Sequence, residues 1–388
     1  MTFFGNQLRL GGEAMKFLAK VALLSFVIWI LSIGRGWAAT GGPALQKAKQ
    51  SAEARGYNFI TSHDEIVAKA KKEGDLRILG NIEPPVIKAA TAAFMKKYPF
   101  LNVVGLETTG SDAAQRTVLE LKSGAAREWD TVGPTQDFRS EYLPYLWKID
   151  ILGMAEQGVL KIPPAMIDSI NRNIVSFSSR FSVVAYNKNL VPPDQVPKRW
   201  EDLVRPEFKG KKFAADVRPT EIAELVPAWG LQKTIDFARK IKDQQPIWVR
   251  GATRTFAAIT AGEIPMMIGV RFHSVRRSQL KDRTGMLQYT VLEPVPLSAS
   301  MPLAVLASAQ HPHAALLLLE WFASPEGQKI IDDYEPLGSS VYVPGGAVEQ
   351  EVRGKKLSVL SWEHYQVIDQ WISKVFEAYG FPAAESAK

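Results

Sequence analysis

Several residues of this chain have the types and spacing needed to bind a small anion. Arg250 and Arg254 flank a glycine and Thr253 at the expected start of a helix, where free backbone N–H groups and the helix dipole attract phosphate or carboxylate. A guanidinium adds a planar fork that holds such groups bidentately. Further candidates are two more arginines and a polar turn before another helix: Arg180, Arg218, Thr109, Gly110 and Ser111. An arginine on a loop is more often a solvated surface charge, so each candidate has a structural alternative.

Four other side chains belong to the same expected region. Thr135 lies on a loop after an expected strand and is a further candidate for polar contact with the ligand. Asp216 and Glu83 are candidates to meet a cationic group if the ligand is a zwitterion. His273 is a candidate ligand contact, although an ordinary loop histidine is the simpler interpretation.

The sequence lacks the motifs of common enzymes and metal sites. Its five histidines show no HExxH or other close metal-ligand spacing, and there is no cysteine to supply a thiolate. A Gly-x-Ser-x-Gly elbow and glycine-rich nucleotide loops are also absent. We therefore expect a binding protein that is not an enzyme, with no cofactor and no metal.

The first forty residues have the plan of a secretory signal peptide. Basic residues precede an uncharged apolar run over 21–33, and Gly36 and Ala38 occupy the −3 and −1 positions of a cleavage site. The apolar run is short for a membrane span, which needs about 20 residues, so a retained anchor is the weaker alternative. Met15 is an alternative start. We expect export to the periplasm, with 1–38 as the signal peptide and 39–60 as a loosely packed leader.

Composition limits the remaining possibilities. The chain has 388 residues, of which 46% are hydrophobic and 22% charged, and this suits two ordinary α/β lobes after removal of the signal. The net charge is +7, but basic residues are interleaved with acidic ones and form no stripe with aromatic residues. Nucleic acid is therefore excluded as an expected partner.

Short strands alternate with helices along most of the chain. The pattern predicts strands over 76–80, 102–106 and 129–132, each followed by polar loop residues, and a second block of the same kind begins at residue 183. Such alternation indicates parallel sheets covered by helices. Ligands of these sheets lie beyond the carboxyl ends of the strands, where the loops run into helices.

Three segments of this second block and the C-terminal region resemble periplasmic solute-binding proteins of ABC transporters, type II, in the branch that binds ferric ion and related organic ligands. They are VVAYNKNLVPPDQVPKRWEDLVRPEFKGK (183–211), TAGEIPMMIG (260–269) and QHPHAALLLLEWFASPEGQKII (310–331). The resemblance covers nearly all of the mature chain, and the SPEGQ segment is its most specific part.

The resemblance implies a two-lobe α/β fold with a hinge and a ligand cleft between the lobes. The first lobe is expected over 61–179 plus 297–388 and the second over 183–293, with crossing segments near 180–182 and 294–296. The protein would be a monomer that closes on a small molecule and docks transiently on a membrane permease.

The ligand implied by the family is in doubt because of one loop. The family's iron binders hold Fe³⁺ with two adjacent tyrosines after the strand that reads MMIGV here, but this chain continues with Arg271 and contains no Tyr-Tyr pair. Arg271 would repel a trivalent cation and attract an anion. We therefore expect the ligand to be a phosphonate, a phosphate ester or a carboxylate. Two alternatives are an importer component that holds iron with other ligands and a periplasmic sensor that feeds a receptor kinase.

Overall fold

The computed structural model describes residues 42–108, 110–334 and 338–381, which leaves the expected signal peptide and Thr109 outside the described residues. The chain divides into a first unit over 1–46 and a second over 47–388. Helix α2 (Pro43–Ala54) begins in the first unit. The second unit is described by itself below. In the described ranges, no helix is long and apolar enough to cross a membrane.

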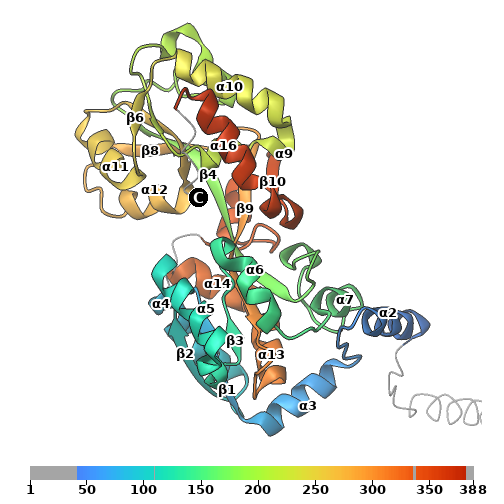
Figure 1. The fold of residues 1–388 in the computed structure, drawn as a ribbon. Helices are drawn as coiled ribbons and strands as arrows, with labels where there is room; N and C mark the ends of the chain where they lie inside the picture. The colour runs from blue at the N-terminus through green and yellow to red at the C-terminus, as the bar shows by residue number, and fades with distance from the viewer. Residues whose placement is uncertain (1–41, 109, 335–337, 382–388) are drawn as a thin grey trace, which may run out of the picture. The chain divides into compact units, whose positions relative to one another are not determined.

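The second unit is built on one mixed sheet in which the strand order is β2-β1-β3-β9-β4-β7-β5-β6, while β10 pairs with β9 and β8 with β4 (Figure 1). The strands β1, β2 and β3 form a first lobe, and β5 to β8 form a second lobe. Both contain parallel pairs, as the α/β alternation predicts. The strands are β1 (Asp75–Gly80), β2 (Asn102–Glu107), β3 (Thr131–Val132), β4 (Ile174–Asn187), β5 (Ala214–Asp216), β6 (Ile247–Val249), β7 (Met266–Arg271), β8 (Leu287–Thr290), β9 (Val295–Val305) and β10 (Leu357–Leu360).

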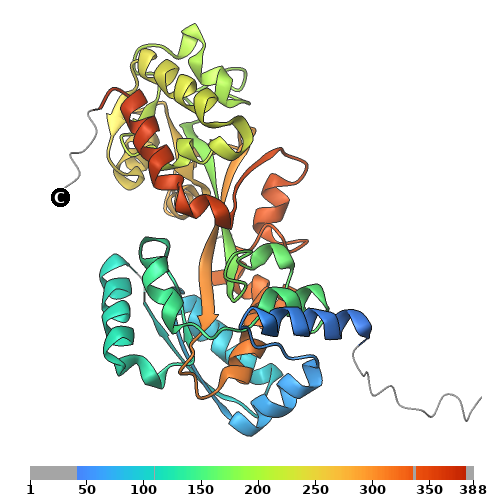
Figure 2. The ribbon, with the colours of Figure 1, turned by 45° about the vertical axis from the view of Figure 1, so that its right-hand side comes forward.

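Two long antiparallel strands, β4 and β9, connect the lobes (Figures 1 and 2). The first part of β4 pairs with β9 as far as Phe181, and from Ser182 onward β4 pairs with β7 and then β8. This change of partner falls within 180–182, a segment that the sequence places between the lobes.

Helices cover the sheet of the first lobe. The central one is α13, in which ten of twelve residues are buried, and a helix that is apolar on every side belongs inside a core. The helices of this lobe are α3 (His63–Glu73), α4 (Pro84–Lys97), α5 (Ser111–Ser123), α6 (Arg139–Tyr142), α7 (Ile151–Glu156), α13 (Pro312–Ala323) and α14 (Pro325–Tyr334).

The C-terminal segment packs with the second lobe. Ile368 and Val375 of α16 and Tyr379 just after it share a core with Trp200 and Phe237, and the two views show α16 beside α10. The expected first lobe included all of 297–388, so the last part of that range differs from the packing observed. The remaining helices are α8 (Thr220–Ala223), α9 (Val226–Trp229), α10 (Leu231–Asp243), α11 (Ala252–Ala261), α12 (Phe272–Gln279), α15 (Ala347–Val352) and α16 (Ile368–Ala378).

Two local expectations differ from the structure. The segment that begins at Phe272 was expected to be a loop and forms helix α12, because Phe272 and Val275, one turn apart, are both buried in the core. The leader was expected to pack loosely, but the backbone of Asn58 bonds to Lys148 and Asp150, and Phe59 is buried.

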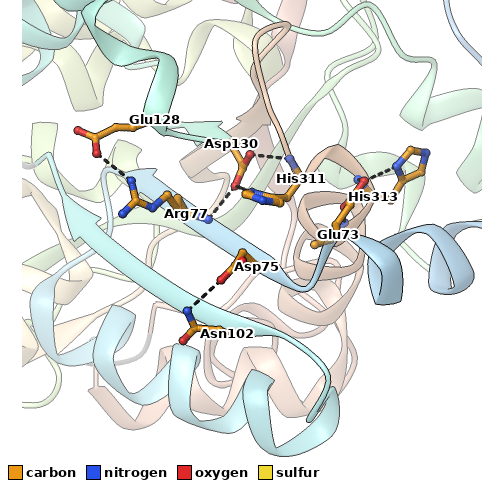
Figure 3. Close-up of polar contacts among 9 residues, drawn as sticks. Glu73, Asp75, Arg77, Asn102, Glu128, Asp130, His311 and His313 are labelled. Atoms are coloured by element: carbon orange, nitrogen blue, oxygen red, sulfur yellow. Dashed lines mark hydrogen bonds and ion pairs between the residues drawn. The ribbon is translucent and has the colours of Figure 1, made fainter.

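Carboxylates fix the start of α13 (Figure 3). Glu73 accepts hydrogen bonds from the Ala314 backbone N–H at 2.8 Å and from His313, whose Nδ1 lies 2.6 Å away. Asp130 accepts from the His311 backbone N–H and lies 2.9 Å from His311 Nδ1. Negative charge at a helix N-terminus is stabilising. The His-x-His pair therefore serves the packing of α13.

We expect Glu73→Gln to lower the free energy of unfolding by about 1–3 kcal/mol, because an amide cannot accept all of these hydrogen bonds. Burial opposes the charge of Glu73, but the bonds from His313 and Ala314 prevail and lower its pKa. This stabilisation is present above the unfolded-state pKa of Glu73 and is lost as pH falls through its folded-state pKa. Urea unfolding should therefore show the gap between wild type and variant closing in acid.

The matched control is Glu65→Gln on the same helix, since the Glu65 side chain makes only an exposed ion pair with Lys69 in the described part of the chain. It should change stability by less than about 1 kcal/mol. Equal effects of the two substitutions would contradict the assignment.

Candidate functional site

Two adjoining cavities lie where β4 and β9 pass between the lobes. The small cavity has a volume of about 190 Å³ and is lined by Glu83 of the first lobe and His273 of the second, among others. The large cavity has a volume of about 360 Å³ and contacts Gly110, Thr135 and Arg271. Asn81, Arg180, Ser300 and Met301 line both cavities. The two cavities therefore share one wall.

Arg180 is the cation at this shared wall. It lies in β4 opposite Ser298 of β9. Its side chain is solvent-accessible, and the accessible surface faces the two cavities. Its guanidinium makes no hydrogen bond or ion pair with any residue that the structure describes. Desolvation by the cavity walls, together with the nearby charge of Arg271, lowers the pKa of Arg180. An arginine nevertheless stays charged, so Arg180 is a fixed cation that makes no ion pair with the described residues, although Glu224 and Glu221 attract it from farther away.

Arg271 lines the large cavity, but its charge is already neutralised. Both terminal nitrogens bond to Glu224, at 2.7 and 2.8 Å, and Nε lies 3.1 Å from Glu221. Burial alone would lower the pKa of Arg271, but the two carboxylates raise it above its usual value. Arg271 was the leading candidate for binding the anion. Its two partners lie about fifty residues earlier in the chain: Glu221 is in α8 and Glu224 follows that helix. No local sequence pattern indicates this pairing.

His273 lines the small cavity as a neutral imidazole. Burial lowers its pKa to about 3, and the charges of Arg180, Arg271 and Arg277 add to the effect. Neither ring nitrogen has a hydrogen-bond partner among the described residues. His273 therefore offers one N–H donor and one nitrogen acceptor to whatever enters the cavity.

Glu83 and Arg277 face each other at the small cavity, with Arg277 Nη2 3.7 Å from Glu83 Oε1. Both side chains are more than a third exposed, so the ion pair contributes little to stability. Glu83 was expected as a contact for a cationic ligand group, and in this structure it already faces a cation.

Three residues of the large cavity were not found from the sequence. Arg139 forms an ion pair with the buried Asp168, and its guanidinium lies 4.7 Å from the Trp362 ring centroid. Tyr365 donates a hydrogen bond to the Ala299 carbonyl at 3.3 Å, and burial raises its pKa to about 12. Trp362 and Tyr365 come from the C-terminal segment, and no local pattern places them beside Arg139.

Five expected residues lie outside the linings of both cavities. They are Asp216, Arg218, Arg250, Thr253 and Arg254. Asp216 accepts a hydrogen bond from the Gly251 backbone N–H at 2.9 Å, and its carboxylate lies 3.5 Å from Arg218 Nε. An internal carboxylate therefore occupies the helix start where we expected an anionic ligand.

The polar turn before α5 is described only in part. Gly110 lines the large cavity, and Ser111 begins α5, while Thr109 lies outside the described residues. Thr135 lines the same cavity, and its hydroxyl oxygen is buried with no partner. Within the described ranges, no group of three or more His, Asp or Glu side chains is arranged to hold a metal ion.

We expect His273→Gln to make stability less dependent on pH. Between about pH 6.5 and pH 3 the unfolded histidine binds a proton that the folded one rejects, so the wild type loses stability as pH falls through this window. The loss is at most about 1.4 kcal/mol per pH unit. Urea unfolding at pH 7 and pH 5 should show a smaller decrease for the variant, and identical decreases would contradict a neutral His273.

The comparisons with known proteins agree on the fold. A Trichodesmium protein, IdiA or FutA, solved with iron and citrate, is 19% identical, with a TM-score of 0.60 over 80% of this chain and 100% of that one. A Mannheimia haemolytica ferric iron-binding protein A in an open conformation is 17% identical, with a TM-score of 0.61 over 79% and 98%. At these identities the likeness shows the fold alone, and it confirms the predicted two-lobe α/β class of type II periplasmic binding proteins.

Two sequence matches identify the family. An Fe(3+)-binding periplasmic protein of Serratia marcescens is 23% identical over 167 residues, which make up 40% of this chain and about half (48%) of that relative. The family model described as bacterial extracellular solute-binding protein matches residues 154–366, more than half of the chain. The chain therefore belongs to the bacterial extracellular solute-binding protein family.

Proposed function

We propose that this protein is the periplasmic solute-binding component of an ABC importer, and that it captures a small anionic solute and delivers it to a membrane permease. Family membership and the two-lobe fold support the general role, which makes and breaks no bond. The ligand class comes from the chain's own residues: a phosphonate, a phosphate ester or a carboxylate.

The observation that carries the anion is that Arg180 makes no ion pair with the described residues. The other arginines at the large cavity, Arg139 and Arg271, are paired with Asp168 and with Glu224 and Glu221. Arg180 has no such partner in the described part of the chain, and it faces both cavities. A charged group in a cavity needs a counter-charge, and a guanidinium matches the geometry of carboxylate and phosphate.

Arg180→Gln tests this role. A hydrogen bond to a charged group contributes about 1.5–3 kcal/mol, so the affinity for an anion should fall by about 10- to 150-fold. The anion is first found with a thermal-shift screen of phosphonates, sugar phosphates and dicarboxylates, in which a ligand at 100 times its Kd stabilises by about 2.7 kcal/mol. Calorimetry then measures the Kd of that anion for the wild type and for Arg180→Gln.

The control for this experiment is Arg218→Gln, which removes the same charge from a residue outside both cavities. It should leave the affinity unchanged. An equal loss in the two variants would mean that overall charge, and not Arg180, attracts the anion.

Ferric ion is the second candidate, because the relatives named above are described as iron-binding or were solved with iron. One local observation favours it: the small cavity holds a neutral His273 nitrogen and the Glu83 carboxylate, both able to ligate a metal. Against it, Tyr365 is the only tyrosine among the described residues that line either cavity, and its pKa of about 12 opposes a phenolate.

Colour distinguishes the two candidates. Ferric–tyrosinate complexes absorb visible light. We mix the protein with Fe³⁺ and either carbonate or citrate and then desalt it. We expect the protein to be colourless, and elemental analysis to find no iron bound to it. A retained red-orange band would overturn the anion proposal in favour of iron. Retained colourless iron would indicate binding through other ligands, such as His273 and Glu83.

The partner in the membrane is also part of this proposal. The expected periplasmic location and a monomeric carrier suit transient docking on a permease. A receptor kinase in place of the permease would make the same protein a sensor, and a permease or kinase gene beside its own would separate these roles.

A further inference from the structure

Polar side chains without protein partners surround the large cavity. Among the described residues, six hydroxyl and carboxamide side chains that line it make no hydrogen bond to another protein group. They are Asn81, Thr135, Gln136, Ser176, Thr220 and Ser300. Ser176 is only 3% exposed, so its hydroxyl has little access to bulk water. A polar group with so little exposure is normally hydrogen-bonded to protein or to ordered water, so the partner of Ser176 has to come from the cavity.

These six side chains share one chemical property. Hydroxyl and carboxamide groups each donate and accept hydrogen bonds, whereas ammonium groups only donate and carboxylates only accept. A ligand hydroxyl also does both. The large cavity is therefore suited to a ligand that carries several hydroxyl groups, and an apolar chain would leave these polar groups unpaired.

The small cavity is suited to a different part of the ligand. Besides Arg180 and the neutral His273, its wall includes the apolar side chains of Phe181, Phe272 and Val86. Its volume of about 190 Å³ is close to half that of its neighbour. The cavity therefore offers a compact anionic group two donors, the Arg180 guanidinium and the His273 N–H.

The charges at the two cavities limit the ligand to one anionic group. Arg139 is neutralised by Asp168, and Arg271 faces two carboxylates, Glu221 and Glu224. Arg277 faces Glu83. This leaves Arg180 as the one guanidinium at the cavities without a carboxylate partner in the described ranges. A second anionic group would lie beside the surplus negative charge of Glu221 and Glu224.

We propose that the ligand is a polyhydroxylated anion with a single anionic group, a sugar phosphate or a sugar acid, whose anionic group lies between Arg180 and His273 and whose hydroxyl groups occupy the large cavity. This inference rests on the proposed capture of an anion and names the class of that anion. Since Arg180 lines both cavities, one molecule can reach both at once.

Calorimetry with four probes tests the proposal: glucose 6-phosphate, gluconate, inorganic phosphate and glucose. We expect at least one of the two hydroxylated anions to bind 10-fold or more tightly than inorganic phosphate, and glucose not to bind. The stronger of the two identifies the head group as phosphate or carboxylate. If inorganic phosphate binds as tightly as glucose 6-phosphate, and gluconate does not exceed it, the hydroxyl contacts are absent and this inference falls while the proposed function stands.

Failure of the proposed function gives a different result. If no anion of the wider screen binds, or if Arg180→Gln has no effect on those that do, capture of an anion through Arg180 is itself wrong. Binding of glucose as tight as that of glucose 6-phosphate would retain the hydroxyl contacts and overturn the anionic group.

Thr220→Val tests the hydroxyl contacts directly, because it removes a hydroxyl with little change in side-chain volume. Loss of one neutral hydrogen bond should weaken the hydroxylated anion about 2- to 10-fold and leave inorganic phosphate unchanged. Thr253→Val is the matched control, because Thr253 is exposed and lies outside both cavities, and it should change neither affinity. Ser176→Ala is a second variant with the same expectation as Thr220→Val. Unchanged binding in both cavity variants would contradict the proposal.

Discussion

The antiparallel pairing of β4 with β9 is the constraint on which the candidate site depends. Ile174 of β4 belongs to the core of the first lobe, while Val183 and Ala185 of the same strand belong to a core of the second. Both halves of the strand are therefore held by buried apolar residues. Because side chains alternate across a strand, a slip of one residue would turn Arg180 away from the cavities and place buried residues in water. The cores of both lobes thus fix the direction of one cation.

The candidate site also requires that, of two neighbouring arginines, one is paired with carboxylates and the other is not. Arg271 ends β7 beside β4, and Glu224 and Glu221 hold it from α8 and the residue after that helix. A guanidinium fixed by two carboxylates can shape a cavity wall, but it has no attraction left for a ligand anion. Arg180 lies next to this group without a carboxylate of its own in the described residues. The paired arginine is therefore a structural element, and the unpaired one is the binding element.

The sequence predicted what depends on neighbours along the chain. The α/β alternation follows from local periodicity, and the strands predicted over 76–80 and 102–106 agree with β1 and β2. The helix start expected beside Gly251 is that of α11. Pairing between distant side chains has no local signal. The sequence predicted Arg180 in a segment between the lobes, but it could not show that Glu224 pairs with Arg271 or that Asp216 accepts the hydrogen bond of the Gly251 N–H. Tyr365 and Trp362 were missed for the same reason, since only the fold brings the C-terminal segment to the cavity.

Because the pairing of individual side chains decides which charges a ligand meets, the net charge of the chain says little about the ligand. The chain carries +7, but charges separated by more than a Debye length, about 8–10 Å at ordinary ionic strength, are largely screened from one another. A ligand in the cavities responds to the few groups that line them, and most of those cations are matched by a carboxylate. A protein of opposite net charge with the same cavity lining would select the same ligand. The sign of the solute is therefore set by which guanidinium lacks a partner, and not by how many basic residues the chain contains.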